Sequence, residues 1–239
     1  TGAPWRDLPE RFGPCSVYNT FRRWHSTGRI DTILEARYNC ISMKKGLSTS
    51  TCGALTAPMS GHPKMLPERV KKHPVNQALG RSRGGFGSKI HLVTDGNGLP
   101  LGFCLSPGQS AEIRYATSAL AMARIPTSSG RYRTRPAHLA ADKAYSSRAL
   151  RAELRRRGIK AVIPQRSDQQ RHHKGRPLVL DKARYRRRNV VERCFGWLKK
   201  FRRFSTRYEK LAGSFAAFIK LAFCLRYLRE LLVDRKPAF

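Results

Sequence analysis

The sequence predicts an α/β fold, in which a mixed sheet is flanked by helices and preceded by a small helical segment. Over residues 79–239, short apolar runs typical of strands alternate with amphipathic helical runs. Residues 1–36 instead show helical spacing interrupted by Pro and Gly. With 239 residues and 40% hydrophobic content, the chain can bury one sizeable core and pack a smaller unit against it.

The first segment, residues 1–36, is predicted to be helical. Val17, Phe21 and Trp24 recur at helical spacing, with Arg22 and Arg23 beside them. Such a segment fits a small helical packing unit. Because basic and aromatic residues interleave, a helical DNA-binding arm is the alternative.

A β-hairpin is predicted next. "KIHLVTDGNGLPLGFCL" consists of two β-rich runs joined by Asp95-Gly96-Asn97-Gly98, which is a strong turn signal. A helix, "SAEIRYATSALAMARI", and a short apolar strand that ends on Asp142, "AHLAADKAYS", follow.

The remaining elements continue the alternation. "SRALRAELRRRG" is a helix with a Ser start and a Gly158 stop, and "IKAVIP" is a buried strand closed by Pro164. A basic loop then leads into a long helix from about 181 to about 204. The loop holds His172 and His173, which have no carboxylate at matching spacing and are expected to be solvated or near phosphate.

The charge of the chain points to a polyanionic partner. Lys and Arg number 48 against 15 Asp and Glu, a net charge of +33, which favours nucleic acid. No membrane partner is expected, since Lys220 and Arg226 interrupt the longest apolar run. The six cysteines show no CxxC pairing, so reduced thiols are expected rather than a zinc site.

One acid stands within the cationic helix "YRRRNVVERCFGWLKK". At about 100° per residue, Tyr185, Arg188, Glu192 and Lys199 share a polar face. The opposite, apolar face should pack onto the sheet; it holds Val190, Val191, Cys194, Trp197, Leu198 and Phe201. The polar face is either a solvated surface with an ion pair or a functional site.

The spacing Tyr-(2)-Arg-(3)-Glu-(6)-Lys resembles the Y-(2)-R-(3)-E-(6)-K signature of bacterial insertion-sequence transposases of the DDE superfamily. "TGAPWRDLPERFG", "ALGRSRGGFGSKIHLV" and "ADKAYSS" are similar to the insertion-sequence-five group within it. The resemblance implies a ribonuclease-H-like catalytic fold, in which two Asp and one Glu bind two divalent ions, Mg²⁺ or Mn²⁺.

The resemblance also implies roles for particular residues. Asp142 would be the second acid of the triad and Glu192 the third, both of them catalytic and metal-binding. Tyr185, Arg188 and Lys199 would contact or position transposon-end DNA. The implied partners are transposon ends and target DNA, bound by a possible homodimer in the bacterial cytoplasm or nucleoid.

The first acid of the triad is missing from residues 37–78, for which irregular backbone is expected. Asp95 lies in the hairpin turn, where Asp-Gly has an ordinary local role. If the codons of this segment are regrouped by one base, the overlap of Leu55 and Thr56 can encode Asp, within an apolar strand. We therefore hypothesise that residues from about 37 to about 77 are translated out of frame; a divergent insertion is the alternative.

Two classes of function remain, and both place the catalytic domain at residues 79–239. The chain is a DNA transposase that cleaves insertion-sequence ends and joins them to target DNA. Alternatively, it is a catalytically inactive DNA-binding remnant that lacks the first catalytic Asp. Under the frameshift hypothesis the segment should also fail to supply the central strand of the domain.

Overall fold

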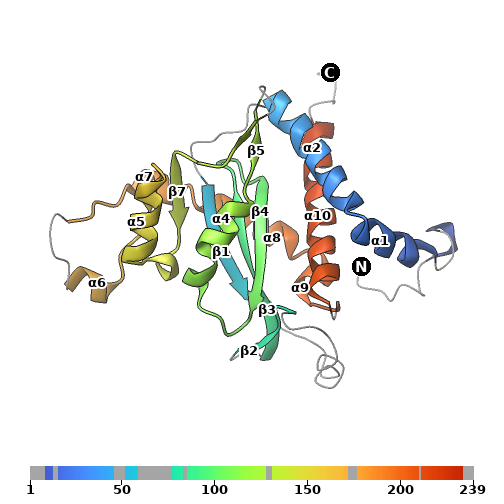
Figure 1. The fold of residues 1–239 in the computed structure, drawn as a ribbon, viewed down its shortest axis with the longest axis horizontal. Coiled ribbons are helices and arrows are strands. Elements are labelled where there is room, and N and C mark those ends of the chain that lie inside the picture. Colours follow the sequence, from blue (N-terminus) through green and yellow to red (C-terminus); the bar gives the residue numbers. More distant parts are fainter. Residues whose placement is uncertain are drawn as a thin grey trace.

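A mixed sheet forms the centre of the protein (Figure 1). The computed structural model describes residues 9–12, 16–45, 52–58, 77–82, 85–127, 131–171, 177–209 and 211–233. The sheet strands are β1 (Cys52–Pro58), β2 (Gly80–Ser82), β3 (Gly85–Thr94), β4 (Pro100–Pro107), β7 (His138–Ala141) and β8 (Lys160–Val162).

The strand order is β4-β3-β1-β7-β8, with β2 beside the first residues of β3. β1 and β4 both pair with residues 89–94 of β3, so they lie on its opposite edges. β1 runs antiparallel to β3 and parallel to β7, and β7 runs parallel to β8. This mixed α/β arrangement agrees with a ribonuclease-H-like fold, and the predicted fold class is confirmed.

Helices cover both faces of the sheet. On one face, here called the α5 face, α4 (Ala116–Met122) and α5 (Arg148–Arg156) enclose a core that includes Val93, Leu139 and Ala141. The other, the α8 face, carries α8 (Asn189–Leu198), α9 (Arg202–Ser205) and α10 (Ala212–Val233). Ile90 and Leu92 point to the α8 face because side chains alternate along β3.

The N-terminal helices pack against α10, on the β4 side of the sheet (Figure 1). These are α1 (Ser16–Ser26) and α2 (Arg29–Lys45), with Gly28 at a φ of 70° between them. Phe21 and Ile30 are buried against Ala217 of α10. The burial favours the packing unit over the DNA-binding arm, which stays a prediction. Since α2 runs past residue 36, the expected boundary there falls inside a helix.

The remaining short elements are η2 (Glu10–Phe12), η3 (Glu112–Tyr115), β5 (Ile125–Pro126), β6 (Tyr132–Arg133), η4 (Lys143–Tyr145), α6 (Ser167–Arg171) and α7 (Lys182–Arg186). In the described parts of the chain, no helix combines the length and apolar character that a membrane span needs. Cys40, Cys104, Cys194 and Cys224 are free thiols.

Irregular backbone was expected for residues 37–78, and this is wrong for the part that the structure describes. Residues 37–45 continue α2, and Cys52–Pro58 form β1, the strand between β3 and β7. The absence of a central strand is likewise not observed. The two neighbouring ladders satisfy the backbone of β1 on both edges, which a side-chain pattern alone does not reveal.

The long helix expected from about 181 to 204 is instead three helices, α7, α8 and α9. Tight turns join α7 to α8, because Arg188 N donates to Tyr185 O at 3.0 Å and Val191 N donates to Arg188 O at 3.0 Å. Bonds to the third preceding residue wind the backbone more tightly than an α-helix. The apolar prediction holds for Val190, Val191, Cys194 and Leu198, which are buried.

The predicted hairpin and the caps of α5 are confirmed. Asp95 N donates to Leu99 O at 2.9 Å, and Gly98 has a φ of 86°. In α5, Leu150 N donates to Ser147 Oγ at 3.0 Å, and Gly158 follows the helix with a φ of 71°. The left-handed φ is the conformation in which Gly is preferred.

Candidate functional site

Asp142 stands directly after β7, as the N-terminal cap of η4. Its backbone is extended, with φ −67° and ψ 160°, and its Oδ1 accepts a hydrogen bond from Lys143 N at 2.6 Å. Leu139 and Ala141 point to the α5 face. Because side chains alternate along extended backbone, Asp142 belongs to the α8 face.

Glu192 lies in the first turn of α8, the helix that packs against β1 and β3. Its side chain is 49% exposed, and its Oε1 pairs with Arg188 Nη2 at 2.6 Å. The Arg188 guanidinium also lies over the Tyr185 ring, 5.4 Å from its centroid. The structure therefore brings Tyr185, Arg188 and Glu192 into one cluster.

Lys199 is the C-terminal cap of α8 and is exposed. It stands seven positions after Glu192, a rise of about 10 Å along a helix. The structure thus places Lys199 on the helix that carries the cluster, at its other end.

Asp142 and the helix that carries Glu192 occupy the same face of the sheet. In the described part of the chain most acids pair with a Lys or Arg, Glu192 among them, whereas Asp142 has no ion-pair partner there. Its carboxylate is available to bind a cation.

Position 55 of β1 adjoins Asp142 in the strand register. The parallel pairing of β1 with β7 runs to Ala54 opposite Ala141, so one further step brings position 55 beside Asp142. Across the antiparallel pair, Leu55 is opposite Leu92, which points to the α8 face. Directly opposed residues share a face, so position 55 belongs to the α8 face as well.

The donor set suits a hard divalent cation but is incomplete. Carboxylate oxygens are the ligands that Mg²⁺ and Mn²⁺ prefer. Asp142 and Glu192 supply two carboxylates, and among the residues that the structure describes no group of three His, Cys, Asp or Glu side chains could hold a metal ion. The resemblance implies a third acid at such a site, and position 55 carries Leu.

The sequence alone did not identify the residues that hold the η4 turn behind Asp142. On its exposed side, Arg166 donates to the carbonyl oxygens of Lys143 and Ala144 at 3.4 and 3.2 Å. Gln169 and Ser146 exchange two hydrogen bonds: Gln169 Nε2 donates to Ser146 O at 3.0 Å, and Ser146 Oγ donates to Gln169 Oε1 at 2.6 Å.

Beneath the turn lies His91, which is fully buried on the α5 face. Its Nδ1 is 3.2 Å from Tyr145 Oη and its Nε2 is 2.8 Å from Ser106 Oγ. Burial, with a smaller contribution from the charge of Lys89, lowers the pKa of His91 to about 4. One signal was present in the sequence: His91 stands between the apolar residues Ile90 and Leu92 of β3.

Asp95 serves the hairpin, as the sequence indicated. Its Oδ1 accepts hydrogen bonds from Asn97 N at 2.9 Å and Leu99 N at 2.8 Å. In the β1–β3 register the last pair is Gly53 with Thr94, so Asp95 lies beside the start of β1, away from position 55. This placement argues against Asp95 as a replacement for the missing acid.

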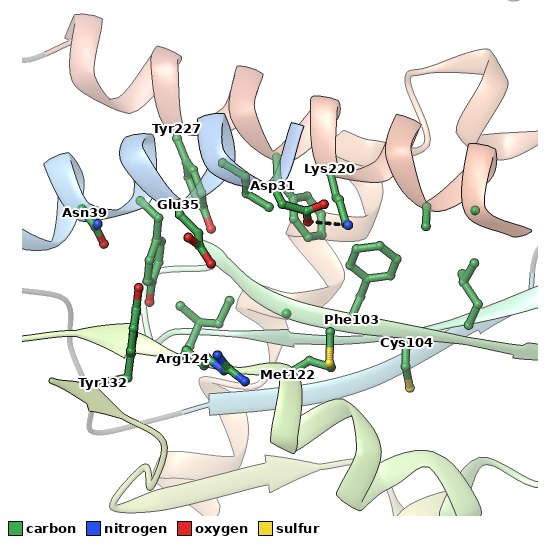
Figure 2. A pocket seen from close by; sticks show the side chains of 18 of the residues that line it. Asp31, Glu35, Asn39, Phe103, Cys104, Met122, Arg124, Tyr132, Lys220 and Tyr227 are labelled. Carbon is green, nitrogen blue, oxygen red and sulfur yellow. Dashed lines mark ion pairs between the residues drawn. The ribbon is translucent and has the colours of Figure 1, made fainter. Parts of the chain in front are cut away.

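A groove of about 630 Å³ lies between α2, α10 and β4 (Figure 2). Phe103 and Met122 form part of its apolar wall, and Asp31 pairs with Lys220 above them. None of the predicted site residues lines this groove. His172 and His173 fall outside the described residues.

Comparisons with known proteins agree on one family. A family model described as "Transposase DDE domain" matches residues 68–226. A Burkholderia cepacia protein assigned as a transposase for insertion sequence element IS402 is 34% identical over 187 residues, 74% of this chain and 84% of the relative. A Brucella ovis protein assigned to insertion sequence element IS6501 is 30% identical over 146 residues, 59% of this chain and 98% of that relative.

Proposed function

This chain belongs to the family of transposases with a DDE domain, and on that premise we propose that it acts in DNA transposition. The proposed reaction is metal-dependent cleavage at insertion-sequence ends, followed by joining of those ends to target DNA. One observation carries the proposal: Asp142 and the helix of Glu192 share a face of the sheet, within the residues that the family matches.

Asp142 and Glu192 are the proposed metal ligands, with Mg²⁺ or Mn²⁺ as the ion. When bound, two such ions activate a water or a 3′-hydroxyl group and stabilise the leaving oxygen of an in-line phosphoryl displacement. Asp142 is oriented by the Lys143 amide, and Glu192 is held by Arg188 until a cation or DNA competes for that pair.

Tyr185, Arg188 and Lys199 are the proposed contacts to transposon-end DNA. Arg188 is stacked on Tyr185 and presents its guanidinium next to Glu192, where a phosphate of the bound strand would lie. Lys199 extends the cationic surface along α8. Such cations offset the repulsion between acidic metal ligands and the phosphate backbone.

The missing first acid bears on the activity of this particular chain. The regrouped codons place Asp at the overlap of Leu55 and Thr56, and the β1 register independently selects position 55 as the neighbour of Asp142. The family match begins at residue 68, after this strand but within the segment proposed to be out of frame. The strand register supports the proposal that the segment is out of frame, so that the chain as given is catalytically inactive or nearly so.

The proposed setting is bacterial DNA in the cytoplasm or nucleoid. A homodimer is proposed to bind paired transposon ends, because both ends must be cut and joined together. The net charge of +33 suits a protein that contacts a long run of phosphates.

Cleavage of end DNA in the presence of Mn²⁺ tests the function. Duplexes taken from the ends of the insertion sequence are incubated with the frame-restored protein and with its Asp142→Asn variant. The frame-restored protein should nick the duplex at its end, and Asp142→Asn should abolish nicking. Equal nicking by the two proteins would show that Asp142 has no catalytic role.

A further inference from the structure

We propose that His91 and Tyr145 are positioning residues that fix the direction of the Asp142 carboxylate, an inference that rests on the metal-binding role proposed above for Asp142. Neither residue reaches the α8 face. They act from the opposite side of the sheet, through the η4 turn that begins at Asp142.

The turn is short, so its geometry is set by few bonds. Tyr145 N donates to Asp142 O at 2.9 Å, and Lys143 N donates to Asp142 Oδ1 at 2.6 Å. A shift of Tyr145 therefore moves the carbonyl of Asp142 and the amide that holds its carboxylate. Because η4 spans only Lys143–Tyr145, there is no further turn of helix to absorb such a shift.

Tyr145 is held by its ring and by its hydroxyl, and the partner of the hydroxyl is itself fixed. Its ring is 1% exposed and packs in the core of the α5 face. Its hydroxyl is 3.2 Å from His91 Nδ1. The His91 ring is in turn stacked on Tyr115, with centroids 4.9 Å apart and planes 18° from parallel, and its Nε2 is bonded to Ser106 Oγ on β4.

The lowered pKa of His91, near 4, keeps the ring neutral at pH 7. A neutral imidazole donates from one nitrogen and accepts at the other. Both tautomers bond Nδ1 to the Tyr145 hydroxyl and Nε2 to Ser106, so either one ties β3 and β4 to the η4 turn. The bonded chain is rigid because every member lies within the sheet or its core.

Metal sites generally contain positioning groups of this kind. Groups that orient a ligand without touching the ion are part of the site, and their loss typically lowers metal affinity by about 10- to 100-fold. Tyr145 and His91 act less directly than such groups, because they influence the Asp142 carboxylate through the backbone of the η4 turn. We therefore expect an effect near the lower end, about tenfold.

Two substitutions of matched chemistry separate positioning from general stability. Tyr145→Phe removes the hydroxyl that bonds His91. Tyr227→Phe removes another buried hydroxyl, which donates to Pro100 O between α10 and β4. Both variants lose one buried hydrogen bond, and only Tyr145 belongs to the turn that follows Asp142.

A second pair tests which nitrogen of His91 matters. The amide of Asn occupies the place of Nδ1, whereas the amide of Gln reaches the place of Nε2. His91→Asn keeps a partner for Tyr145, and His91→Gln keeps a partner for Ser106. His91→Asn should therefore resemble the unmodified protein more closely than His91→Gln does.

Two measurements on the full chain, neither of which needs DNA, test whether Tyr145 and His91 position Asp142. Mn²⁺ alone is titrated and the free ion is counted by electron paramagnetic resonance, with Asp142→Asn as the reference for a lost site. Hydrogen exchange of the Lys143 amide is followed by NMR, because that amide bonds the Asp142 carboxylate directly. Thermal unfolding checks that each variant is folded.

Tyr145→Phe should raise the Mn²⁺ dissociation constant about tenfold and accelerate exchange of the Lys143 amide, whereas Tyr227→Phe should do neither at a similar loss of Tm. Equal behaviour of the two Phe variants would overturn the inference, as would better Mn²⁺ binding by His91→Gln than by His91→Asn. Unchanged Mn²⁺ binding in Asp142→Asn would instead contradict the proposed metal site, and Lys143 exchange would still decide the positioning role.

Discussion

Asp142 and Asp95 are both acids at strand ends, and their surroundings give them different roles. Asp142 has one bond from the next amide and is partly exposed on the α8 face. Asp95 is fully buried, and two backbone amides donate to its Oδ1 while its Oδ2 has no hydrogen-bond partner among the described residues. The first arrangement suits an ion, and the second fixes a turn.

Burial raises the pKa of Asp95 from 3.8 to about 6, although its backbone hydrogen bonds act in the opposite direction. The folded state therefore holds this proton more tightly than the unfolded state does. The protonated Asp95 carboxyl therefore contributes to the free energy of unfolding. This contribution is fully present below about pH 4 and is lost as pH rises to about 6.

Asp95→Asn should remove this dependence. Asn keeps an oxygen for the amides of Asn97 and Leu99 and carries no charge to bury. We expect the variant to be more stable than the unmodified protein at pH 7, by up to about 3 kcal/mol, and the two to converge toward pH 4. Urea unfolding at pH 4, 5, 6 and 7 measures the difference; a constant difference across that range would contradict the assigned pKa.

At the scale of elements, β4 and α4 approach each other most closely at Gly102. An added Cβ would lie 2.6 Å from Met122 O and 2.9 Å from Ala123 N, both of which are backbone atoms. Backbone cannot move aside as a flexible side chain can. The end of α4 can therefore pack this closely on β4 only because position 102 has no side chain.

Gly102→Ala should lower the free energy of unfolding by about 1–3 kcal/mol, as overpacking does elsewhere. Gly196→Ala in α8 is the matched control, because its added Cβ meets nothing within 4 Å. Ala is the better helix former, so this variant should gain about 0.5–1 kcal/mol. Chemical denaturation compares the two, and a Gly102→Ala protein as stable as the parent would refute the close approach.

The elements that the sequence predicted correctly are those with local signals. Asp95-Gly96-Asn97-Gly98 sets a turn, and Ser147 and Gly158 bound a helix, because each acts on its own backbone. β1 was missed since its pairing is distant: Cys52 lies opposite Leu139. The tight turn at Arg187 and Arg188 was missed for a different reason, as it leaves the apolar spacing on either side almost intact.

In the candidate site as well, residues with a local sequence signal were predicted and residues held by long-range contacts were not. Motif spacing indicated Asp142 and Glu192, and the fold places Asp142 and the Glu192 helix on one face. The residues that position Asp142 could not be predicted from the sequence, because His91 and Tyr145 are 54 positions apart in the chain. Such contacts depend on which strands become neighbours, and the strand order is a property of the whole sheet.

The whole molecule is strongly cationic, and its binding to DNA should depend steeply on salt. Each phosphate neutralised by a Lys or Arg contributes about −0.9 to the slope of log K against log salt concentration. Arg188→Ala and Lys199→Ala should each weaken binding to end DNA and reduce the slope by about one contact. Lys220→Gln, in the groove beside α2, is the control that should leave the slope unchanged.

Fluorescence anisotropy with a labelled end duplex measures the binding constant at salt concentrations between about 50 and 300 mM, a range in which phosphate contacts dominate binding. An affinity that does not change with salt would rule out an electrostatic DNA surface. An equal loss of slope in Lys220→Gln would show that the contacts are spread over the molecule rather than gathered along α8.

We predict that position 55, Asp142 and Glu192 form one metal site on the α8 face. Titration of Mn²⁺ into Leu55→Asp and Thr56→Asp tests it most directly, because these neighbours alternate between the two faces of β1. Leu55→Asp should bind Mn²⁺ more tightly than the chain as given, because a third carboxylate adds a ligand and a negative charge, and Asp142→Asn in the same protein should cancel the gain. Equal affinities for the two Asp variants, or a gain that survives Asp142→Asn, would show that position 55 and Asp142 do not share a metal site.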